Sequence, residues 1–541
     1  MVGEKELFYR GLYYQRLGNL EDAVRVYRDC LAATPENLGA MNNLGACLVD
    51  LGQTHEAVEI LSRASKHVSN DPEVLNNLGN ALQRSLRVEE ARHHFEAANE
   101  LQPDNLTILL NLSKVLLRQG EYETALGHLE KARHLDPTNA EVALVDSQAL
   151  PVIYEFEAQI KKARQRMEAK LLELENREEK IIDPASSVGQ TSFFLAYQGM
   201  NDLEIQRRFA AVYQRYCPNL NFIADHCCEY KGKKYGRVKI GFISALFGSH
   251  TVGKLFHGLI KALDREQYEV FVFHIGLDRR ETDKQLRKLS GCVDHFICLP
   301  PLLFRAREAI AAKRMEIIYY TDIGMEPLSY FLAFSRLAPV QCASWGHPST
   351  TGITNIDYFL SWRIHEPEGS LKHYSENLIL FDGFCTNYSR PASPKPSKDF
   401  AALGINQNAN KYLCLQSLFK FHPIFDQMIA EILRQDENAC IILLEGQQRN
   451  WGKLLRKRFG RTLSGLTDRV VFLPRLDHGD YLQLITLADV ILDFMNIYYG
   501  FNFNCQGQNI DEIVNNSSIL KIYPNPIYPY DLLKIETQNK I

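Results

Sequence analysis

Polar residues cluster directly after three apolar stretches of strand length in the middle of the chain. The clusters cover residues 244–250, 321–325 and 345–352, and the last of them reads WGHPSTTG. If the apolar stretches are parallel strands, their carboxyl ends meet at one edge of a sheet, where α/β proteins bind their ligands. We therefore expect the hydroxyl, carboxylate and imidazole groups of these loops to converge on one ligand-binding cleft.

The segments around these loops alternate between strand and helix patterns. From Arg237 the apolar runs VKIGFIS, YEVFVFHI, HFICL and MEIIYYTDI are separated by amphipathic helical segments. This predicts a parallel sheet covered on both faces over residues 237–395. A second alternation begins at Lys411 and predicts another such lobe over residues 411–493. Two lobes of this kind make an α/β, two-Rossmann (GT-B-like) glycosyltransferase architecture a good candidate. Neither first strand is followed by the Gly-rich dinucleotide fingerprint, which argues against a dehydrogenase.

The first quarter of the chain carries a repeat of 34 residues. Its small residues and prolines recur in one phase: Ala23, Ala57, Ala91 and Ala125; Gly11, Gly45 and Gly79; Gly18, Gly52 and Gly120; Pro35, Pro103 and Pro137. The pattern resembles the tetratricopeptide repeat, a helix-turn-helix unit, and predicts an all-α superhelix of about four repeats over residues 4–139. Leu86 stands where the other repeats have a turn glycine. Residues 140–236 should form connecting helices.

Stacked repeats form a concave groove that binds extended peptides or other proteins. Asparagines recur on the helix that lines the groove in such arrays: Asn42, Asn43, Asn76, Asn77 and Asn111. Their amides could hold a peptide backbone without reading its side chains. The alternative is that exposed asparagines only keep the groove soluble. We favour peptide binding, and therefore expect protein or peptide partners.

Composition places the chain among soluble globular proteins of about three or four domains. The 61 basic and 65 acidic residues give a net charge of −4, which provides no reason to expect a nucleic-acid or anionic-membrane partner. Without a signal peptide or an apolar run of about 18 residues, we expect a cytoplasmic protein with free thiols. The cluster His226-Cys227-Cys228 has no second cluster at finger spacing, so we expect no metal site.

Three segments carry a more specific resemblance. They are FGSHTVGKL at 247–255, DIGMEPLSYFLAFSRLAPVQCASWGHPSTTG at 322–352 and QSLFKFHP at 416–423. In this order, and after tetratricopeptide repeats, they resemble the O-linked N-acetylglucosamine transferase and Spindly family of protein glycosyltransferases, and bacterial Spindly-like members most. The resemblance implies an inverting, metal-independent transfer of a sugar from a nucleotide diphosphate to Ser or Thr hydroxyls. It implies no cofactor beyond the donor substrate, UDP-N-acetylglucosamine or GDP-fucose.

The resemblance also assigns catalytic residues. His250 matches a family histidine beside the acceptor and the sugar, and its near-neutral pKa suits polarising a hydroxyl or orienting a phosphate. The alternative is that His250 caps the helix beginning at Thr251. Lys420 matches the lysine that contacts the diphosphate, where negative charge grows during the reaction.

Further residues fall at nucleotide-sugar positions of the family. Gly346 matches a glycine whose missing side chain admits the sugar, and Thr350 and Thr351 could donate to the phosphate or form an ordinary turn. The remaining matches are Gln416 and Ser417, near the phosphate or base, and Leu476 and Tyr481, near the base.

Residues 494–541 depart from the family pattern. The family continues after Asp493 with a polar loop and a helix whose amino terminus binds the diphosphate. Here the last 48 residues contain 8 Asn, 8 Ile and 5 Tyr, but no Ala or Arg. This shift indicates translation in a wrong frame or fusion to foreign sequence. We therefore expect a poorly ordered tail, an incomplete second lobe and impaired activity.

The leading hypothesis is a protein O-glycosyltransferase. The alternative from another class is a non-catalytic scaffold that binds proteins through its repeats. A third possibility is a small-molecule glycosyltransferase with an accessory array, which a failure of peptides to bind the groove would favour.

Overall fold

The computed structural model describes residues 4–492, except residues 229, 231, 233, 234, 364, 365, 367, 384–386, 388–399, 401 and 402. The tail predicted over residues 494–541 lies outside the described residues. The chain divides into two compact units. Unit 1 comprises Met1–Ala149, Arg166–Phe193 and Asp202–Tyr388, and unit 2 comprises Leu150–Gln165, Phe194–Asn201 and Ser389–Ile541.

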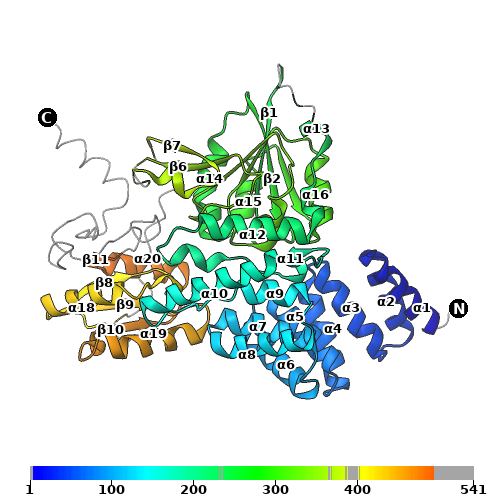
Figure 1. Ribbon diagram of the computed structural model, residues 1–541, viewed down its shortest axis with the longest axis horizontal. Helices are drawn as coiled ribbons and strands as arrows, with labels where there is room; N and C mark the ends of the chain where they lie inside the picture. The colour runs from blue at the N-terminus through cyan, green and yellow to red at the C-terminus, as the bar shows by residue number, and fades with distance from the viewer. Residues whose placement is uncertain are drawn as a thin grey trace. The chain divides into compact units, whose positions relative to one another are not determined.

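Unit 1 begins with four consecutive helix pairs (Figure 1). The pairs are α1 (Glu4–Arg16) with α2 (Leu20–Ala33), α3 (Leu38–Asp50) with α4 (Thr54–His67), α5 (Pro72–Arg84) with α6 (Val88–Leu101), and α7 (Leu106–Gln119) with α8 (Tyr122–Leu135). Each pair packs on the next, so the helices form the array that the 34-residue period predicts.

The repeated small residues allow the helices of each pair to approach closely. A Cβ atom on Gly11 would lie 2.5 Å from the Tyr27 ring, and one on Gly79 would lie 2.6 Å from the Phe95 ring. The repeated alanines have no exposed surface: Ala23, Ala57, Ala91 and Ala125. Side chains with the same period accept hydrogen bonds from the first turns of α3, α5 and α7: Asn37, Asp71 and Asn105.

The turn inside each pair needs one residue with a positive φ angle. Gly18, Gly52 and Gly120 adopt φ angles of 71°, 76° and 87° at this position. Leu86 takes the same place in the third pair with φ 63°, a conformation that costs an L-residue free energy. The third repeat therefore holds Leu86 in a backbone conformation that a glycine adopts in the other three repeats.

Seven helices connect the array to the first sheet within the described residues: α9 (Ala140–Ser147), α10 (Glu157–Glu175), α11 (Pro184–Ser187), η1 (Phe193–Tyr197), α12 (Leu203–Tyr216), η2 (Pro218–Asn221) and α13 (Asp225–Cys228). The apolar stripe of α10 is buried, as its helical spacing predicts: Ile160, Met167, Leu171 and Leu174. Among the described residues, no helix is both long and apolar enough to cross a membrane.

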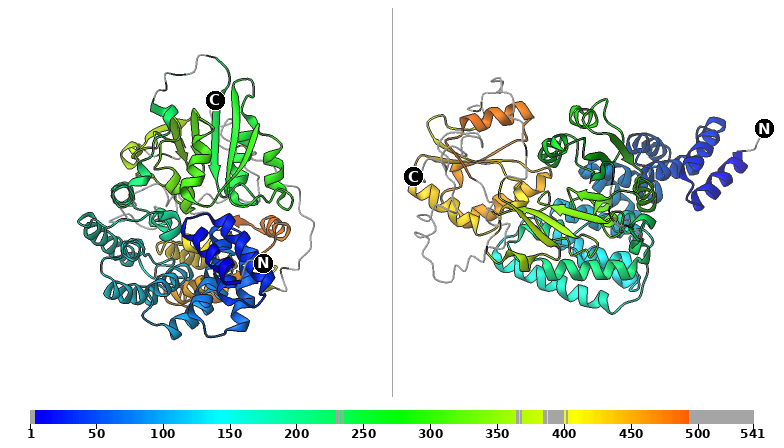
Figure 2. Two further views of the ribbon diagram at one scale, coloured as in Figure 1. Left: turned by 90° about the vertical axis from the view of Figure 1, so that its right-hand side faces the viewer. Right: turned by 90° about the horizontal axis from the view of Figure 1, so that it is seen from above.

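The first sheet, in unit 1, is parallel throughout and has the strand order β3-β2-β1-β4-β5-β6-β7. Its strands are β1 (Val238–Ser244), β2 (Tyr268–Ile275), β3 (His295–Leu299), β4 (Ile317–Tyr320), β5 (Val340–Ser344), β6 (Tyr358–Trp362) and β7 (Asn377–Phe381). The helices between them are α14 (Thr251–Ala262), α15 (Lys284–Ser290), α16 (Leu303–Ala311), α17 (Pro327–Leu332) and η3 (Ser370–His373). Figure 2 shows these helices around the sheet.

The second sheet, in unit 2, is also parallel, in the order β10-β9-β8-β11. Its elements are β8 (Asn410–Cys414), η5 (Leu418–Lys420), α18 (Phe425–Gln435), β9 (Ala439–Leu444), α19 (Arg449–Thr462), η6 (Thr467–Arg469), β10 (Val470–Leu473), α20 (His478–Leu487) and β11 (Val490–Ile491). Ile441 and Leu443 face a core with α18 and α19, whereas Cys440 and Ile442 face a core with α20. The structure thus has the expected fold class, helical repeats followed by parallel α/β sheets.

Candidate functional site

The strand order of the first sheet reverses at β1 and β4. From β1 the chain adds β2 and β3 on one side, then returns to place β4 on the other side. The loops after β1 and β4 therefore leave the sheet in opposite directions, and ligands of α/β proteins bind at such a point. These are the predicted polar loops 244–250 and 321–325.

The three predicted loops contact one another. The Ser244 hydroxyl donates to Asp322 Oδ2 at 2.9 Å, which joins the loop after β1 to the loop after β4. The loop after β5 packs on the same place, because Gly346 lies against the main-chain oxygen of Thr321 and His347 lies against Gly324. The predicted convergence of these loops is thus confirmed within unit 1.

His250 is the N-cap residue of α14. Its Nδ1 accepts a hydrogen bond of 3.2 Å from the main-chain N–H of Val252. An imidazole that accepts at Nδ1 carries its proton on Nε2 when neutral, so Nε2–H is a donor. Partial burial, followed by the charge of Lys254, lowers the pKa of His250 and favours this neutral form. His250 can therefore cap α14 through Nδ1 and donate a hydrogen bond to a ligand through Nε2–H at the same time.

Asp283 holds the tip of the His250 loop. Its carboxylate accepts from the main-chain N–H of Ser249 at 3.1 Å and caps α15 through the N–H groups of Gln285 and Leu286, at 2.8 and 3.2 Å. Burial alone would raise the pKa of Asp283, but these N–H donors outweigh it and lower the pKa. The loop is thus fixed to the start of α15 by a carboxylate that stays ionised.

Asp322 holds the base of the same loop and was not singled out by its sequence. Its Oδ2 also accepts from the main-chain N–H of Ala245 at 3.2 Å, and its Oδ1 accepts no hydrogen bond from the described residues. The side chain is fully buried, and burial, followed by the nearby Glu326, raises its pKa to about 7. Asp322 is therefore a buried acid that titrates near neutrality beside the predicted binding loop.

The residues predicted in the loop after β5 have protein partners. The space beside Gly346 is filled by the Thr321 oxygen and by Phe256, so the close approach seen here is packing. The Thr350 hydroxyl donates to Glu376 at 2.7 Å, and the Thr351 N–H donates to the same carboxylate at 2.8 Å. Both threonines are buried, in agreement with the turn alternative, and their contact with a phosphate stays a prediction.

Lys420 lies in unit 2, at the end of η5. Its Nζ is 5.6 Å from the centroid of the Tyr197 ring, a cation–π distance. Phe419 packs edge-on against Phe194, Tyr197 and Trp451, with ring centroids 5.6, 4.9 and 5.6 Å away. Aromatic residues of the connecting segment thus hold the loop that carries Lys420. Gln416 is half-buried and Ser417 exposed on the same loop, where the Ser417 oxygen accepts from the Lys420 N–H at 2.9 Å.

A buried ion pair stands behind this loop. Arg458 donates to Asp426 Oδ1, to the Phe421 oxygen and to the Tyr154 oxygen, each at 2.8 Å. Neither charged side chain is more than 1% exposed. Tyr197 and Arg458 are the supporting residues that sequence reasoning missed. Both residues lie far from Lys420 in the sequence, so no local sequence pattern indicates that they support it.

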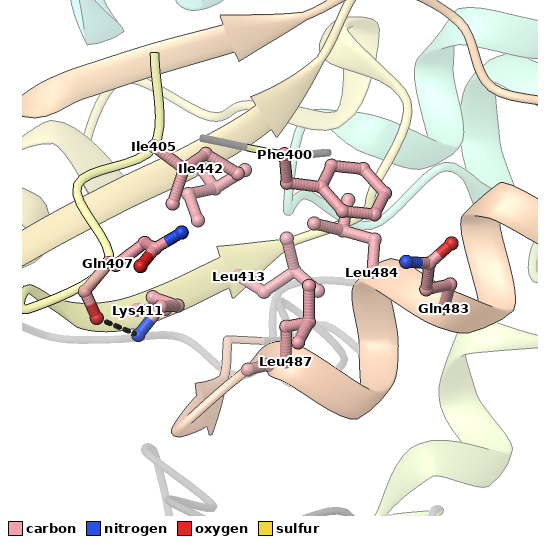
Figure 3. A pocket seen from close by; sticks show the side chains of 10 residues that line it. Phe400, Ile405, Gln407, Lys411, Leu413, Ile442, Gln483, Leu484 and Leu487 are labelled. Carbon is pink, nitrogen blue, oxygen red and sulfur yellow. Dashed lines mark hydrogen bonds between the residues drawn. The ribbon is translucent and has the colours of Figure 1, made fainter. Parts of the chain in front are cut away.

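Leu476 lies two residues before α20 and Tyr481 lies within that helix. Both are half-buried, and Leu476 packs against the core that contains Leu484. A mostly apolar pocket of about 370 Å³ opens beside the same helix (Figure 3). Its lining residues are Phe400, Ile405, Gln407, Lys411, Leu413, Ile442, Gln483, Leu484, Leu487 and Ala488. No predicted site residue lines this pocket.

The asparagines of the repeat array bond to one another. Asn77 donates to Asn42 Oδ1 at 2.9 Å, and Asn111 donates to Asn76 Oδ1 at 3.0 Å, so each bond joins neighbouring repeats. Asn43 instead donates to the Tyr27 hydroxyl at 3.3 Å. The amides thus form a ladder that leaves further amide groups to bind a peptide, and that binding stays a prediction.

Comparisons with known proteins identify both parts of the chain. Residues 204–385 match the model of glycosyl transferase family 41. Residues 15–80 and 76–140 match models of the tetratricopeptide repeat. The family 41 match contains the His250 loop and the two loops that contact it.

Two curated relatives come from Arabidopsis thaliana. The probable UDP-N-acetylglucosamine–peptide N-acetylglucosaminyltransferase SEC is 23% identical over 306 residues, 54% of this chain and 30% of the relative. The probable UDP-N-acetylglucosamine–peptide N-acetylglucosaminyltransferase SPINDLY is 26% identical over 286 residues, 50% of this chain and 30% of the relative. The chain thus spans 30% of the length of each.

A solved structure shares the fold. A mutant of the Thermobaculum terrenum O-GlcNAc transferase superposes with a TM-score of 0.60 and 20% identity, covering 84% of this chain and 78% of that protein. Repeats and a family 41 domain therefore follow one another here as the sequence motifs predict. The chain thus carries a glycosyl transferase family 41 domain after amino-terminal tetratricopeptide repeats, and it is similar to O-linked N-acetylglucosamine transferases and Spindly proteins.

Proposed function

We propose that this chain is a protein glycosyltransferase that transfers a sugar from a nucleotide diphosphate sugar to Ser or Thr hydroxyls. The observation that carries the proposal is the position of His250. It lies at the strand-order reversal of a family 41 domain, on a loop fixed by Asp283 and Asp322. A loop held at both ends can present its imidazole to a ligand with little loss of conformational entropy.

The proposed reaction is an inverting transfer without a metal ion. The acceptor hydroxyl oxygen bonds to the anomeric carbon while the bond from that carbon to the diphosphate breaks. Nε2–H of His250 would donate to the acceptor or to a phosphate oxygen, and the Lys420 ammonium would offset the charge that develops on the diphosphate. While Nδ1 caps α14, His250 acts as an orienting donor, and the hydroxyl proton passes to an oxygen of the departing diphosphate.

The donor is UDP-N-acetylglucosamine or GDP-fucose in this proposal. Gln416, Ser417, Leu476 and Tyr481 would contact its nucleotide, as the family motifs imply. Acceptor proteins would bind in the groove of the repeat array through the asparagine ladder. The composition of residues 494–541 lacks the pattern of the family's second phosphate-binding helix, so we expect low donor affinity and slow turnover.

Nucleotide protection tests the donor site before any turnover is required. UDP or GDP should raise the melting temperature of the purified chain, and Lys420→Ala should abolish the rise. Lys453→Ala is the matched control, because Lys453 is exposed on α19 in the same unit. Incubation with labelled nucleotide sugar and peptides then measures transfer. If neither nucleotide protects the chain and no label is transferred, the protein is the non-catalytic scaffold of the alternative hypothesis.

A further inference from the structure

The outer surfaces of α14 and α15 carry a surplus of positive charge. Both helices bury apolar side chains in one core on the first sheet, and Figure 1 shows them side by side. Residues 251–262 and 276–291, which contain the two helices, hold seven Lys or Arg residues but three Asp or Glu residues. The whole chain has a net charge of −4, so this surface has the opposite sign to the chain as a whole.

Four lysines on this surface have no negative partner. Lys254 and Lys261 on α14, and Lys284 and Lys288 on α15, are exposed, and none of them forms an ion pair with another described residue. His257 is half-buried between the two helices, where burial, followed by the charges of Lys288 and Lys261, lowers its pKa. Because one imidazole senses a lysine from each helix, the charges form one continuous surface. We call these four lysines and His257 the lysine face.

The lysine face begins at the candidate site. His250 caps α14, and Asp283 caps α15 while it accepts from the main-chain N–H of Ser249 at 3.1 Å, so both helices start beside the His250 loop. Lys254 lies one turn beyond His250 and helps to lower its pKa. From there the 12 residues of α14 extend about 18 Å, the length of about five residues of an extended peptide. An acceptor that reaches His250 can therefore also contact the lysine face.

We propose that the lysine face binds acidic residues beside the acceptor hydroxyl, so that the enzyme prefers acceptor proteins with a run of Asp or Glu next to the modified Ser or Thr. This inference rests on the proposed function, since it concerns the acceptor of that reaction. Lysines attract carboxylates as point charges without fixed geometry, so the preference is for negative charge rather than for one sequence.

A single-stranded nucleic acid fits this surface less well. Proteins that bind such strands combine positive charge with aromatic side chains on which the bases stack. Phe256 is the one Phe, Tyr or Trp residue in the two segments, and it has no exposed surface. The lysine face therefore offers charge without stacking, which favours an acidic peptide.

Fluorescence anisotropy tests the preference with two labelled peptides. They share one Ser and differ in about five flanking residues, which are all Glu or all Gln. The Glu peptide should bind about tenfold more tightly at about 0.05 M NaCl and should lose most of this advantage at about 0.5 M, because salt screens exposed charges. Equal affinities at low salt overturn the proposal. An oligothymidylate of equal charge that binds more tightly than the Glu peptide also overturns it.

Lysine substitutions test whether the preference arises from this surface. Lys261→Gln with Lys288→Gln should weaken binding of the Glu peptide about threefold or more and leave the Gln peptide unchanged. Lys313→Gln with Lys372→Gln is the matched control, because both lysines are exposed in the same family 41 domain and form no ion pair with a described residue. Equal effects of the two double variants on the Glu peptide overturn the proposal.

His257 reports directly on occupancy of the lysine face. Carboxylates bound near Lys261 and Lys288 offset their charges, so the Glu peptide should raise the pKa of His257 in an NMR titration, whereas the Gln peptide should not. An unchanged pKa with the Glu peptide bound contradicts the proposal.

Nucleotide protection separates this inference from the proposed function. If UDP or GDP protects the chain but both peptides bind equally, only the acidic preference is refuted. If the Glu peptide binds preferentially but neither protection nor transfer occurs, the catalytic function is refuted and the lysine face is a docking surface of the scaffold.

Discussion

Arg458 donates a hydrogen bond of 2.8 Å to the main-chain oxygen of Phe421, the residue that follows Lys420. The same guanidinium binds Asp426 at 2.8 Å, and Thr462 donates to the second oxygen of that carboxylate at 2.8 Å. A buried cation therefore ties α19, the start of α18 and the Lys420 loop together. The position of Lys420 depends on this network as well as on the aromatic residues around Phe419.

Arg458→Met should destabilise the protein strongly, because it leaves Asp426 buried without its positive partner. We expect a loss of about 3–5 kcal/mol in the free energy of unfolding. Arg456→Met is the matched control, since the ion pair of Arg456 with Glu445 is partly exposed and is worth about 0–1 kcal/mol. Urea denaturation measures both variants. A loss for Arg458→Met no larger than for Arg456→Met would show that the buried pair does not stabilise unit 2.

Leu86→Gly should stabilise the repeat array. Leu86 has a φ angle of 63° and is 60% exposed, so glycine removes the backbone strain and little packing is lost. Glycine also gives the unfolded chain more conformational freedom, which offsets part of this gain. The expected net increase in the free energy of unfolding is about 0.5–1 kcal/mol. Gly120→Ala is the reverse test at the equivalent turn, where φ is 87°, and should destabilise. Thermal unfolding compares the variants, and a lower melting temperature for Leu86→Gly contradicts the prediction.

The titration of Asp322 should make stability depend on pH. Its pKa of about 7 in the folded protein lies above the usual value of 3.8, so the folded state binds a proton more tightly than the unfolded state. The stability that protonated Asp322 adds to the folded state is therefore fully present below about pH 4 and is lost as the pH rises through 7. The total change in the free energy of unfolding is about 1–4 kcal/mol.

Asp322→Asn isolates this contribution, because asparagine keeps the shape and cannot ionise. Relative to the wild type, the variant should gain stability between pH 5 and pH 8, as measured by urea denaturation at about three pH values in that range. Asp29→Asn, on the exposed face of α2, controls for the general effect of removing one carboxylate. Parallel pH profiles for wild type and Asp322→Asn would mean that Asp322 is ionised throughout this range.

Local periodicity was enough to predict the repeats and the parallel strands. Ala23, its equivalents and the apolar strand runs are signals contained within one element, so period and strand length reveal them. The convergence of the loops after β1, β4 and β5 also followed, because parallel strands place their carboxyl ends at one edge. What a given side chain does in those loops was harder to predict.

The contacts that the sequence did not predict join distant parts of the chain. Asp322 reaches the loop after β1, Arg458 reaches Tyr154, and Thr350 and Thr351 meet Glu376. The spacing of residues in the sequence does not predict these contacts, because they form only when the helices and strands pack together. The same reason explains the asparagine ladder. Its period was visible in the sequence, but its bonds between Asn77 and Asn42 required the stacking of two repeats.

Substitutions at His250 can separate its two roles. His250→Asn keeps an oxygen that can accept from the Val252 N–H, because asparagine is a favourable N-cap, but it removes the Nε2–H donor. His250→Ala removes both and should lose about 1 kcal/mol of stability, whereas His250→Asn should stay close to the wild type. If the imidazole contacts the donor sugar, both variants should lose the extra thermal protection that a nucleotide sugar gives over the nucleotide alone. Full protection with His250→Asn would leave His250 with the capping role only.

The pH dependence of the cap provides an independent check. Nδ1 can accept from Val252 only while it is unprotonated, and burial with Lys254 lowers the pKa of His250 in the folded protein. The stability that the His250 cap contributes is therefore present above the ordinary histidine pKa of about 6.5. It is lost as the pH falls through the lower pKa that His250 has in the folded protein. His250→Asn should not show this loss. Nitrogen-15 NMR of the histidine rings should place the proton of neutral His250 on Nε2, and a proton on Nδ1 would contradict the geometry of the cap.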